Sequence, residues 1–223
     1  GSFSDVSASL GPVRAVPTWS VSASFLDFDR DGWLDLFVGH YVTYSVETNI
    51  RCFLPAGGLN YCPPQVYRAQ PSTLFHNNRD GTFTDVTVEA GMATEFGPTL
   101  GVSTADFNGD GWIDIYVAND GQANQLWINQ HNGTFKNTAL LSGVAVGDAG
   151  KPKSSMGVDA ADFDNDGDED LLVTTLTGQG SDLFVNDGSG AFTERGAAAG
   201  IRAATLPLTG FGVGWLDFDK AVA

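Results

Sequence analysis

Three short acidic segments of this sequence place oxygen-bearing side chains at alternate positions and then enter an apolar stretch. They read DFDRDGWLDLFV at 27–38, DFNGDGWIDIYV at 106–117 and DFDNDGDEDLLV at 162–173. Counted from the first Asp, each has Asp or Asn at positions 1, 3, 5 and 9 and Gly at position 6. Donors at alternate positions can converge inside a tight turn, for which Gly supplies the backbone freedom. The segments therefore predict sites for a hard cation.

The predicted ligands are mostly carboxylates, with the backbone carbonyl of position 7 as a further donor. A set of about six or seven oxygens suits Ca²⁺ better than Mg²⁺, which keeps its waters, or Zn²⁺, which prefers nitrogen and sulfur. Clustered carboxylates repel one another without a cation, so we expect structural calcium that ties two strands together. The residues are Asp27, Asp29, Asp31, Trp33 and Asp35; Asp106, Asn108, Asp110, Trp112 and Asp114; and Asp162, Asp164, Asp166, Asp168 and Asp170.

The segments begin like EF-hand loops but do not continue like them. An EF-hand needs a bidentate Glu at position 12 and flanking helices. Position 12 is Val38, Val117 or Val173, inside strand-like stretches, so EF-hands and dockerins are excluded, and Asp at position 9 is expected to close the site. Trp33 and Trp112 are expected to pack over the loops. Plain acidic turns are the alternative, which the agreement of three copies disfavours.

The acidic segments belong to longer repeats that return about every 55 residues once one insert is removed. A second shared motif follows each segment, at 74–91, 126–143 and 183–200. Each repeat holds four short stretches rich in Val, Ile, Phe, Tyr and Trp, separated by Asn, Asp and Gly, as expected of strands and hairpins. In the second repeat the stretches are TLGVSTADF (99–107), DIYVAND (114–120), QLWIN (125–129) and TFKNTAL (134–140).

Four strands per repeat of about 50 residues are typical of a propeller blade. We therefore predict an all-β fold, a β-propeller segment of about three and a half four-stranded blades, in which only AAAGIRAA (197–204) approaches a helical pattern. A partial ring is expected to be a piece of a longer protein or to self-associate through open blade edges. The expected division is 1–11, last strand of a preceding blade; 18–91, blade with insert 42–72; 97–143, blade; 154–200, blade; and 208–223, first strand of a truncated blade.

Composition limits the partners. Asp and Glu total 27 against 11 Lys and Arg, which gives a net charge of −16. That balance argues against binding to nucleic acid or to an anionic membrane surface. No apolar run approaches the about 18 residues that a membrane span needs.

The insert at 42–72 is the element that breaks the repeat. Cys52 and Cys62 close a short loop within it, which predicts a disulfide and an oxidising compartment; two free thiols or half of a metal site are the alternatives. Tyrosine, enriched at binding hot spots, gathers there, so the insert is either a recognition surface or a stapled lid. The tyrosines are Tyr41, Tyr44, Tyr61 and Tyr67.

The remaining polar residues give no catalytic constellation. His40, His76 and His131 fall at different repeat positions and no two are close in sequence; His76 stands where the other repeats have Ile128 and Val185, so we expect it to pack rather than to react. Lys153 precedes two serines but no nucleophile elbow or oxyanion signature accompanies them, so a solvated loop is expected. No catalytic residue is predicted.

The motif D-F-D-x-D-G-x-x-D-L-x-V, followed by L-F-x-N-x-x-G-x-F-x-D-V, resembles the FG-GAP/VCBS repeat found in the β-propeller of integrin α chains. FGPTLGV (96–102) and FGVG (211–214) fit its first strand, and the insert with its flank (51–83) is similar to secreted proteins of the cartilage acidic protein-like (ASPIC/UnbV-related) family. The resemblance implies a seven-bladed, calcium-binding, extracellular or periplasmic propeller for adhesion or scaffolding, with the loop ligands above. The fourth acidic loop departs from the pattern after Asp219, and no counterpart of those relatives' C-terminal domain is seen.

Three functions follow. The leading one is a non-enzymatic, calcium-stabilised module that binds an extracellular protein or a glycan. The alternative is the propeller part of a secreted calcium-dependent carbohydrate-active enzyme, a lyase or hydrolase, which perturbed carboxylates away from the loops would favour. The third is a structural spacer.

Overall fold

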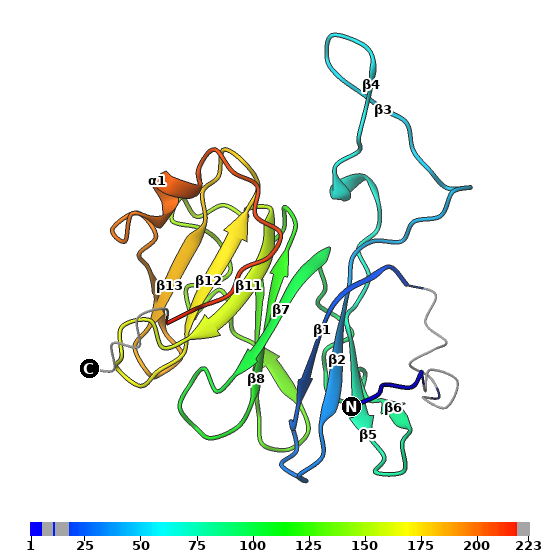
Figure 1. Ribbon diagram of the computed structural model, residues 1–223. Helices are drawn as coiled ribbons and strands as arrows, with labels where there is room; N and C mark the ends of the chain where they lie inside the picture. The colour runs from blue at the N-terminus through cyan, green and yellow to red at the C-terminus, as the bar shows by residue number, and fades with distance from the viewer. Residues whose placement is uncertain (6–10, 12–17, 218–223) are drawn as a thin grey trace.

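The computed structural model describes residues 1–5, 11 and 18–217. Three four-stranded antiparallel sheets stand side by side, and in each sheet strands consecutive along the chain are neighbours (Figure 1). We call these sheets blades 1, 2 and 3. Blade 1 holds β1 (Ser20–Leu26), β2 (Asp35–His40), β5 (Thr73–Asn77) and β6 (Phe83–Asp85); blade 2 holds β7 (Thr99–Ala105), β8 (Asp114–Asn119), β9 (Gln125–Asn129) and β10 (Phe135–Asn137); blade 3 holds β11 (Ser155–Ala161), β12 (Asp170–Thr175), β13 (Asp182–Asn186) and β14 (Phe192–Glu194).

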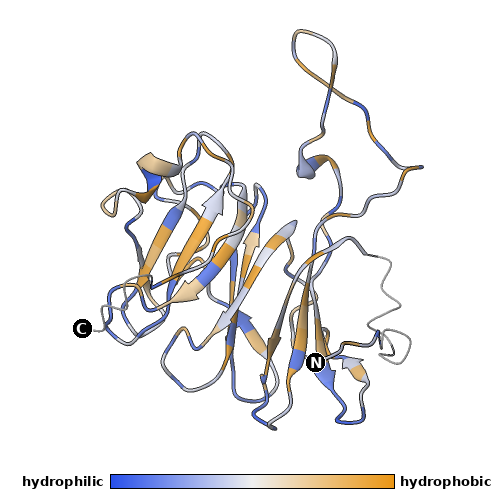
Figure 2. Cartoon of the chain, viewed as in Figure 1, coloured by the Kyte–Doolittle hydropathy of each residue, from blue (hydrophilic) through white to orange (hydrophobic). Residues whose placement is uncertain are grey.

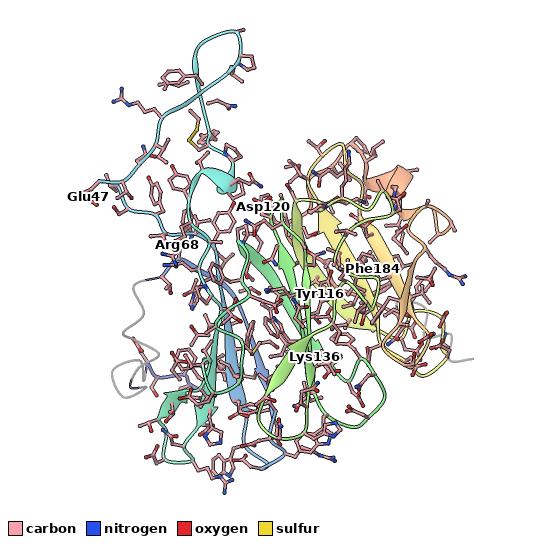
Figure 3. The ribbon with its side chains drawn as sticks, turned by 180° about the vertical axis from the view of Figure 1, so that it is seen from behind. Glu47, Arg68, Tyr116, Asp120, Lys136 and Phe184 are labelled. Carbon is pink, nitrogen blue, oxygen red and sulfur yellow. A yellow bond between two sulfur atoms is a disulfide. The ribbon has the colours of Figure 1, made fainter. Side chains whose placement is uncertain are left out.

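The core lies between the blades rather than inside one sheet. One buried apolar cluster joins blade 1 to blade 2, and a second joins blade 2 to blade 3. Tyr116 on β8 and Phe184 on β13 are both fully buried in the second cluster (Figure 3). Inner strands buried on both faces need near-continuous apolar sequence, and Figure 2 shows the orange, hydrophobic residues concentrated along the strands.

Close approach of the blades requires glycine on strands that face the next blade, at Gly39 on β2 and at Gly101 on β7. A Cβ added to Gly101 would lie 2.3 Å from the carbonyl oxygen of Met156 on the next blade, and one added to Gly39 would lie 2.5 Å from Thr99. Real Cβ contacts are longer than this, so these glycines set the spacing between blades. The all-β prediction is confirmed, and the sheets are consistent with blades of a partial propeller.

Two features differ from or extend the expectations. A short helix, α1 (Ile201–Thr205), overlaps 197–204, the stretch whose pattern came nearest to a helix but was not predicted as one, and it lies beside β13. The described part of 208–223 runs beside blade 3 without forming a strand, with Gly210 N–H donating to Thr175 O at 3.2 Å. Of the strand expected in 1–11, residues 6–10 lie outside the described residues, as do 218–223.

The insert forms an arm that projects beyond blade 1 (Figure 1). We call residues 43–68 the arm; a β-bridge between Val42 and Ala69 closes its base. It contains β3 (Cys52–Phe53), β4 (Leu59–Asn60) and the 3₁₀ turn η3 (Pro64–Val66). The disulfide between Cys52 and Cys62 is present, as predicted. Within the described residues, no helix has the length and apolar character to cross a membrane.

Candidate metal centres

The three acidic segments form the connections between the first and second strands of each blade, at the same end of all three blades (Figure 1). We call them loops 1, 2 and 3. In every loop the Asp at position 1 accepts hydrogen bonds from the backbone N–H groups of positions 5 and 6, at 2.7–3.1 Å. The position-6 glycines all have positive φ, between 84° and 97°. The repeated local sequence therefore builds the same turn three times.

The Asp at position 9 is the buried anchor of each loop. Asp35, Asp114 and Asp170 are all 0% exposed. Each accepts one backbone N–H from the Phe at position 2 and another from the Asn that ends the third strand, at 2.8–3.2 Å. One carboxylate thus joins the ends of three strands. Because a carboxylate has about four acceptor sites, two remain for a cation.

Burial makes these anchors weaker acids than usual. It raises the pKa of Asp35 to about 6 and that of Asp114 to about 7, against the backbone hydrogen bonds, which lower both. The pKa of Asp170 is raised by the same cause. A nearby cation would favour the ionised form.

Carboxylate oxygens converge in two of the loops. Single oxygens of Asp27, Asp29 and Asp35 all lie within 4.8 Å of one another in loop 1, as do oxygens of Asp162, Asp164 and Asp170 in loop 3. In loop 2 an amide replaces one carboxylate, and Asn108 Nδ2 donates to Asp110 at 2.8 Å. The donor set of loops 1 and 3 fits a hard divalent cation, since all of it is oxygen and most of it is anionic. Loop 2 has the same turn with one fewer charge.

Loops 1 and 2 are partly neutralised by side chains that the sequence reasoning did not assign to them. The side chain of Arg79 donates to Asp31 Oδ2 at 2.5 and 3.0 Å, and Nε2 of His131 lies 2.8 Å from Asp110 Oδ2. Both residues occupy the same place in the hairpin after the third strand, where blade 3 has Gly188. The sequence signal that could have revealed these contacts was the presence of a basic residue at this hairpin position in two repeats and of Gly in the third.

The negative charge of loop 3 is not neutralised by basic side chains of the described residues. Among the described residues, no Lys, Arg or His forms an ion pair with it. Burial and then the neighbouring carboxylates raise the pKa of Asp168, whereas the hydrogen bond from Arg79 lowers that of Asp31. Among the three loops, loop 3 therefore has the most acidic residues and no basic partner within the described residues.

Two of the histidines contact the loops, and His76, for which a packing role was expected, also packs with its ring centre 6.1 Å from that of Phe28. His76 Nε2 lies 3.0 Å from Asp29 and 3.7 Å from Asp31, and His131 contacts loop 2. His40 alone is buried in the fold, hydrogen-bonded to Ser20 and Thr73 at 3.0 and 2.9 Å.

The tryptophans at position 7 differ. Trp112 stacks on His131 at 4.9 Å and lies under the guanidinium of Arg30 from loop 1, 5.3 Å from its ring centre, so it packs over its loop as predicted. Trp33 is 48% exposed.

The Asn that ends the third strand of blades 2 and 3 also links each of these blades to the one before it. Asn129 Nδ2 donates to Phe28 O in loop 1 at 2.8 Å, and Asn186 Nδ2 donates to Phe107 O in loop 2 at 2.9 Å. Loops 1 and 2 are therefore fixed to the following blade as well as to their own. The repeat shows that this Asn recurs in the sequence, but it does not indicate which residue of the neighbouring blade the side chain contacts.

Lys153 is not in a solvated loop, contrary to expectation. Its Nζ lies 2.5 Å from Asp182 Oδ1, and Asp182 is 2% exposed. Arg202 of α1 contacts the same carboxylate at 3.2 Å and Glu194 at 2.7 Å. The network fixes α1 and the loop before β11 to blade 3.

Comparison with known proteins agrees with this geometry. The FG-GAP-like repeat family matches residues 66–117 and 106–173, which span β5 to β12. Cartilage acidic protein 1 of Homo sapiens is 34% identical over 111 residues, that is, 48% of this chain and 16% of that protein. The proteins of the same name from Xenopus tropicalis and Mus musculus are 32% and 31% identical over 49% and 48% of this chain, and again 16% of each relative is covered. The chain contains FG-GAP-like repeats, arranged as blades of a partial β-propeller, and is similar to cartilage acidic protein 1.

Proposed function

We propose that the chain is a calcium-stabilised, extracellular propeller module that binds a protein or glycan partner. The observation that carries the calcium role is the convergence of carboxylates in loops 1 and 3. In each of these loops, one oxygen from each of three carboxylates lies within 4.8 Å of the other two. The ligands would be the side chains of positions 1, 3, 5 and 9 and the carbonyl of position 7 in each loop. Bound calcium would supply positive charge where burial and mutual repulsion oppose ionisation.

The proposed role of the metal is structural. Each loop joins two strands directly, and the position-9 anchor reaches a third strand. A cation held there would tie together the ends of three strands of one blade, and the Asn contacts would extend the effect to the next blade. Binding to the folded state alone stabilises it by mass action.

A binding role is preferred to catalysis because Asp182, a buried carboxylate away from the loops with a raised pKa, is already paired with basic side chains. Burial raises the pKa of Asp182, but Lys153 and Arg202 contact it directly. That arrangement is a structural ion network rather than a free acid in a cleft. The disulfide and the similarity to cartilage acidic protein 1 support an extracellular location.

The test is a thermal melt of the chain in EDTA, in Ca²⁺ and in Mg²⁺, with calorimetric titration of calcium. We expect a calcium-specific rise in Tm and a stoichiometry of about three, from one ion per loop. The Asp164→Ala variant, which removes the position-3 oxygen altogether, should lose the loop 3 ion, and the exposed Asp80→Asn variant, outside the loops, should not. Equal Tm in EDTA and calcium would refute the proposal.

A further inference from the structure

A series of aromatic rings lines the junction of blade 1 and the arm. Trp19 meets Tyr41 at 5.5 Å between ring centres and 83° between planes, and it meets Tyr44 at 5.6 Å. Tyr44 in turn meets Tyr67 at 5.7 Å and 82°. Trp19 and Tyr44 remain 49% and 42% exposed. The rings therefore form a ridged apolar surface, in which two of the three contacts are nearly perpendicular and that of Trp19 with Tyr44 is tilted by 52°.

These rings line a groove. A hollow of about 630 Å³ lies between the rings and the disulfide-bonded hairpin of the arm, and one of about 430 Å³ adjoins it at Trp19 and Tyr44. A third, of about 550 Å³, shares Thr18 and Gln70 with the second and extends along blade 1. We call the three together the arm groove.

The two ends of the arm groove differ in charge. The arm end is lined by aromatic rings and Arg51. The blade end is lined by Asp85 and Glu89, which are exposed, and by His40. Burial lowers the pKa of His40, so it adds no positive charge at neutral pH. A ligand with an apolar segment at the arm end and basic groups at the blade end would match this surface.

We propose that the arm groove binds a proline-rich peptide segment of a partner protein, with Lys or Arg flanking the prolines. A polyproline II helix repeats every three residues and is ordered before binding, and it docks into aromatic-lined grooves. The prolines would lie in the slots beside Trp19, Tyr44 and Tyr67, and the basic residues would lie beside Asp85 and Glu89. The inference rests on the binding role proposed above and names its ligand class.

A peptide fits this surface better than a glycan. At the rings themselves, two hydroxyls that a sugar could use are already hydrogen-bonded within the protein: that of Tyr41 donates to Asp120 at 2.7 Å and that of Tyr67 donates to Asn49 at 3.3 Å. Perpendicular ring contacts also present ridges rather than one flat stacking face. The exposed apolar edges that remain match pyrrolidine rings.

The experiment is calorimetric titration of the calcium-loaded chain with octaproline and with octaproline extended by arginines at either end. We expect an arginine-flanked peptide to bind at least about threefold tighter than octaproline at low salt. Tyr44→Ala should weaken it at least about tenfold. Phe53→Ala, which removes a 63% exposed aromatic of the arm outside the groove, should leave it unchanged.

A charge variant checks the orientation. The double variant Asp85→Asn, Glu89→Gln should remove the advantage of the arginines, whereas Glu47→Gln, on the arm but outside the groove, should keep it (Figure 3).

The proposal is overturned if none of the peptides binds, if Tyr44→Ala binds as well as the original chain, or if chitohexaose binds and the peptides do not. The melts in calcium and EDTA are run on the same samples. Calcium stabilisation without peptide binding overturns the groove proposal alone, and peptide binding without calcium stabilisation overturns the metal proposal alone.

Discussion

The buried anchor Asp114 makes the stability of the calcium-free protein depend on pH in an unusual direction. An unfolded Asp ionises near pH 4, but burial raises the pKa of Asp114 to about 7 in the fold. Between these values the folded state binds more protons than the unfolded state. The free energy of unfolding therefore falls as pH rises from about 4 to 7. Asp35, with its pKa raised to about 6, acts in the same direction.

The size of this effect follows from the two pKa values. Each tenfold change in proton affinity is about 1.4 kcal/mol, so Asp114 contributes at most about 4 kcal/mol over the whole window. Between pH 5 and pH 7.5 the expected loss is about 2–3 kcal/mol. Calcium needs the ionised carboxylate, so the calcium-loaded protein should show a smaller fall.

The assay is urea unfolding at pH 5 and pH 7.5, in EDTA and in calcium. Asp114→Asn keeps the size of the side chain but cannot ionise. In EDTA, we therefore expect the decrease in the free energy of unfolding between pH 5 and pH 7.5 to be smaller by about 2–3 kcal/mol in this variant. The control is Asp80→Asn, which changes an exposed carboxylate in a hairpin. Hydrogen bonds from Thr82 lower the pKa of Asp80. An Asp114→Asn protein with the full fall of the original chain would refute the reasoning.

Three further predictions use matched positions in the blades. Gly101→Ala should destabilise the chain by about 1–3 kcal/mol in urea unfolding, because its Cβ would meet Met156 O at 2.3 Å, whereas Gly212→Ala, with nothing within 4 Å, should be near neutral. Asn129→Ala should cost about 1–3 kcal/mol through its contacts to Phe28 and Ile113, and an unchanged midpoint would contradict the cross-blade role. Burial lowers the pKa of His40, so the free energy of unfolding should fall as pH falls below about 6.5, where the unfolded state takes up a proton that the folded state does not. His40→Asn, which copies Asn119 at the matching position of blade 2, should remove this fall. If the fall remains in the variant, another group causes it.

The strands and loops of this protein could be predicted because their determinants are local. The four stretches predicted for blade 2 contain β7 to β10, since alternating or continuous apolar residues bounded by Asn, Asp and Gly specify strands and turns. The turn hydrogen bonds of each loop join residues four or five positions apart. The disulfide closes a separation of 10 residues. Helix α1 overlaps the stretch 197–204 but was not predicted, because Gly196 and Gly200 weaken the helical pattern there; an ion pair between Arg202 and Glu194 links it to blade 3.

The sequence by itself determined the repeat, the blades, the acidic loops and the cysteine pair, because each of these depends on residues close together along the chain. Only the tertiary structure decided which loop keeps its charge, since Arg79 reaches Asp31 across 48 residues and Asn129 reaches Phe28 across 101. It also decided that the aromatic rings of Trp19, Tyr44 and Tyr67 meet. Such contacts depend on strand register and on how blades stack, and the spacing of residues within one repeat contains neither.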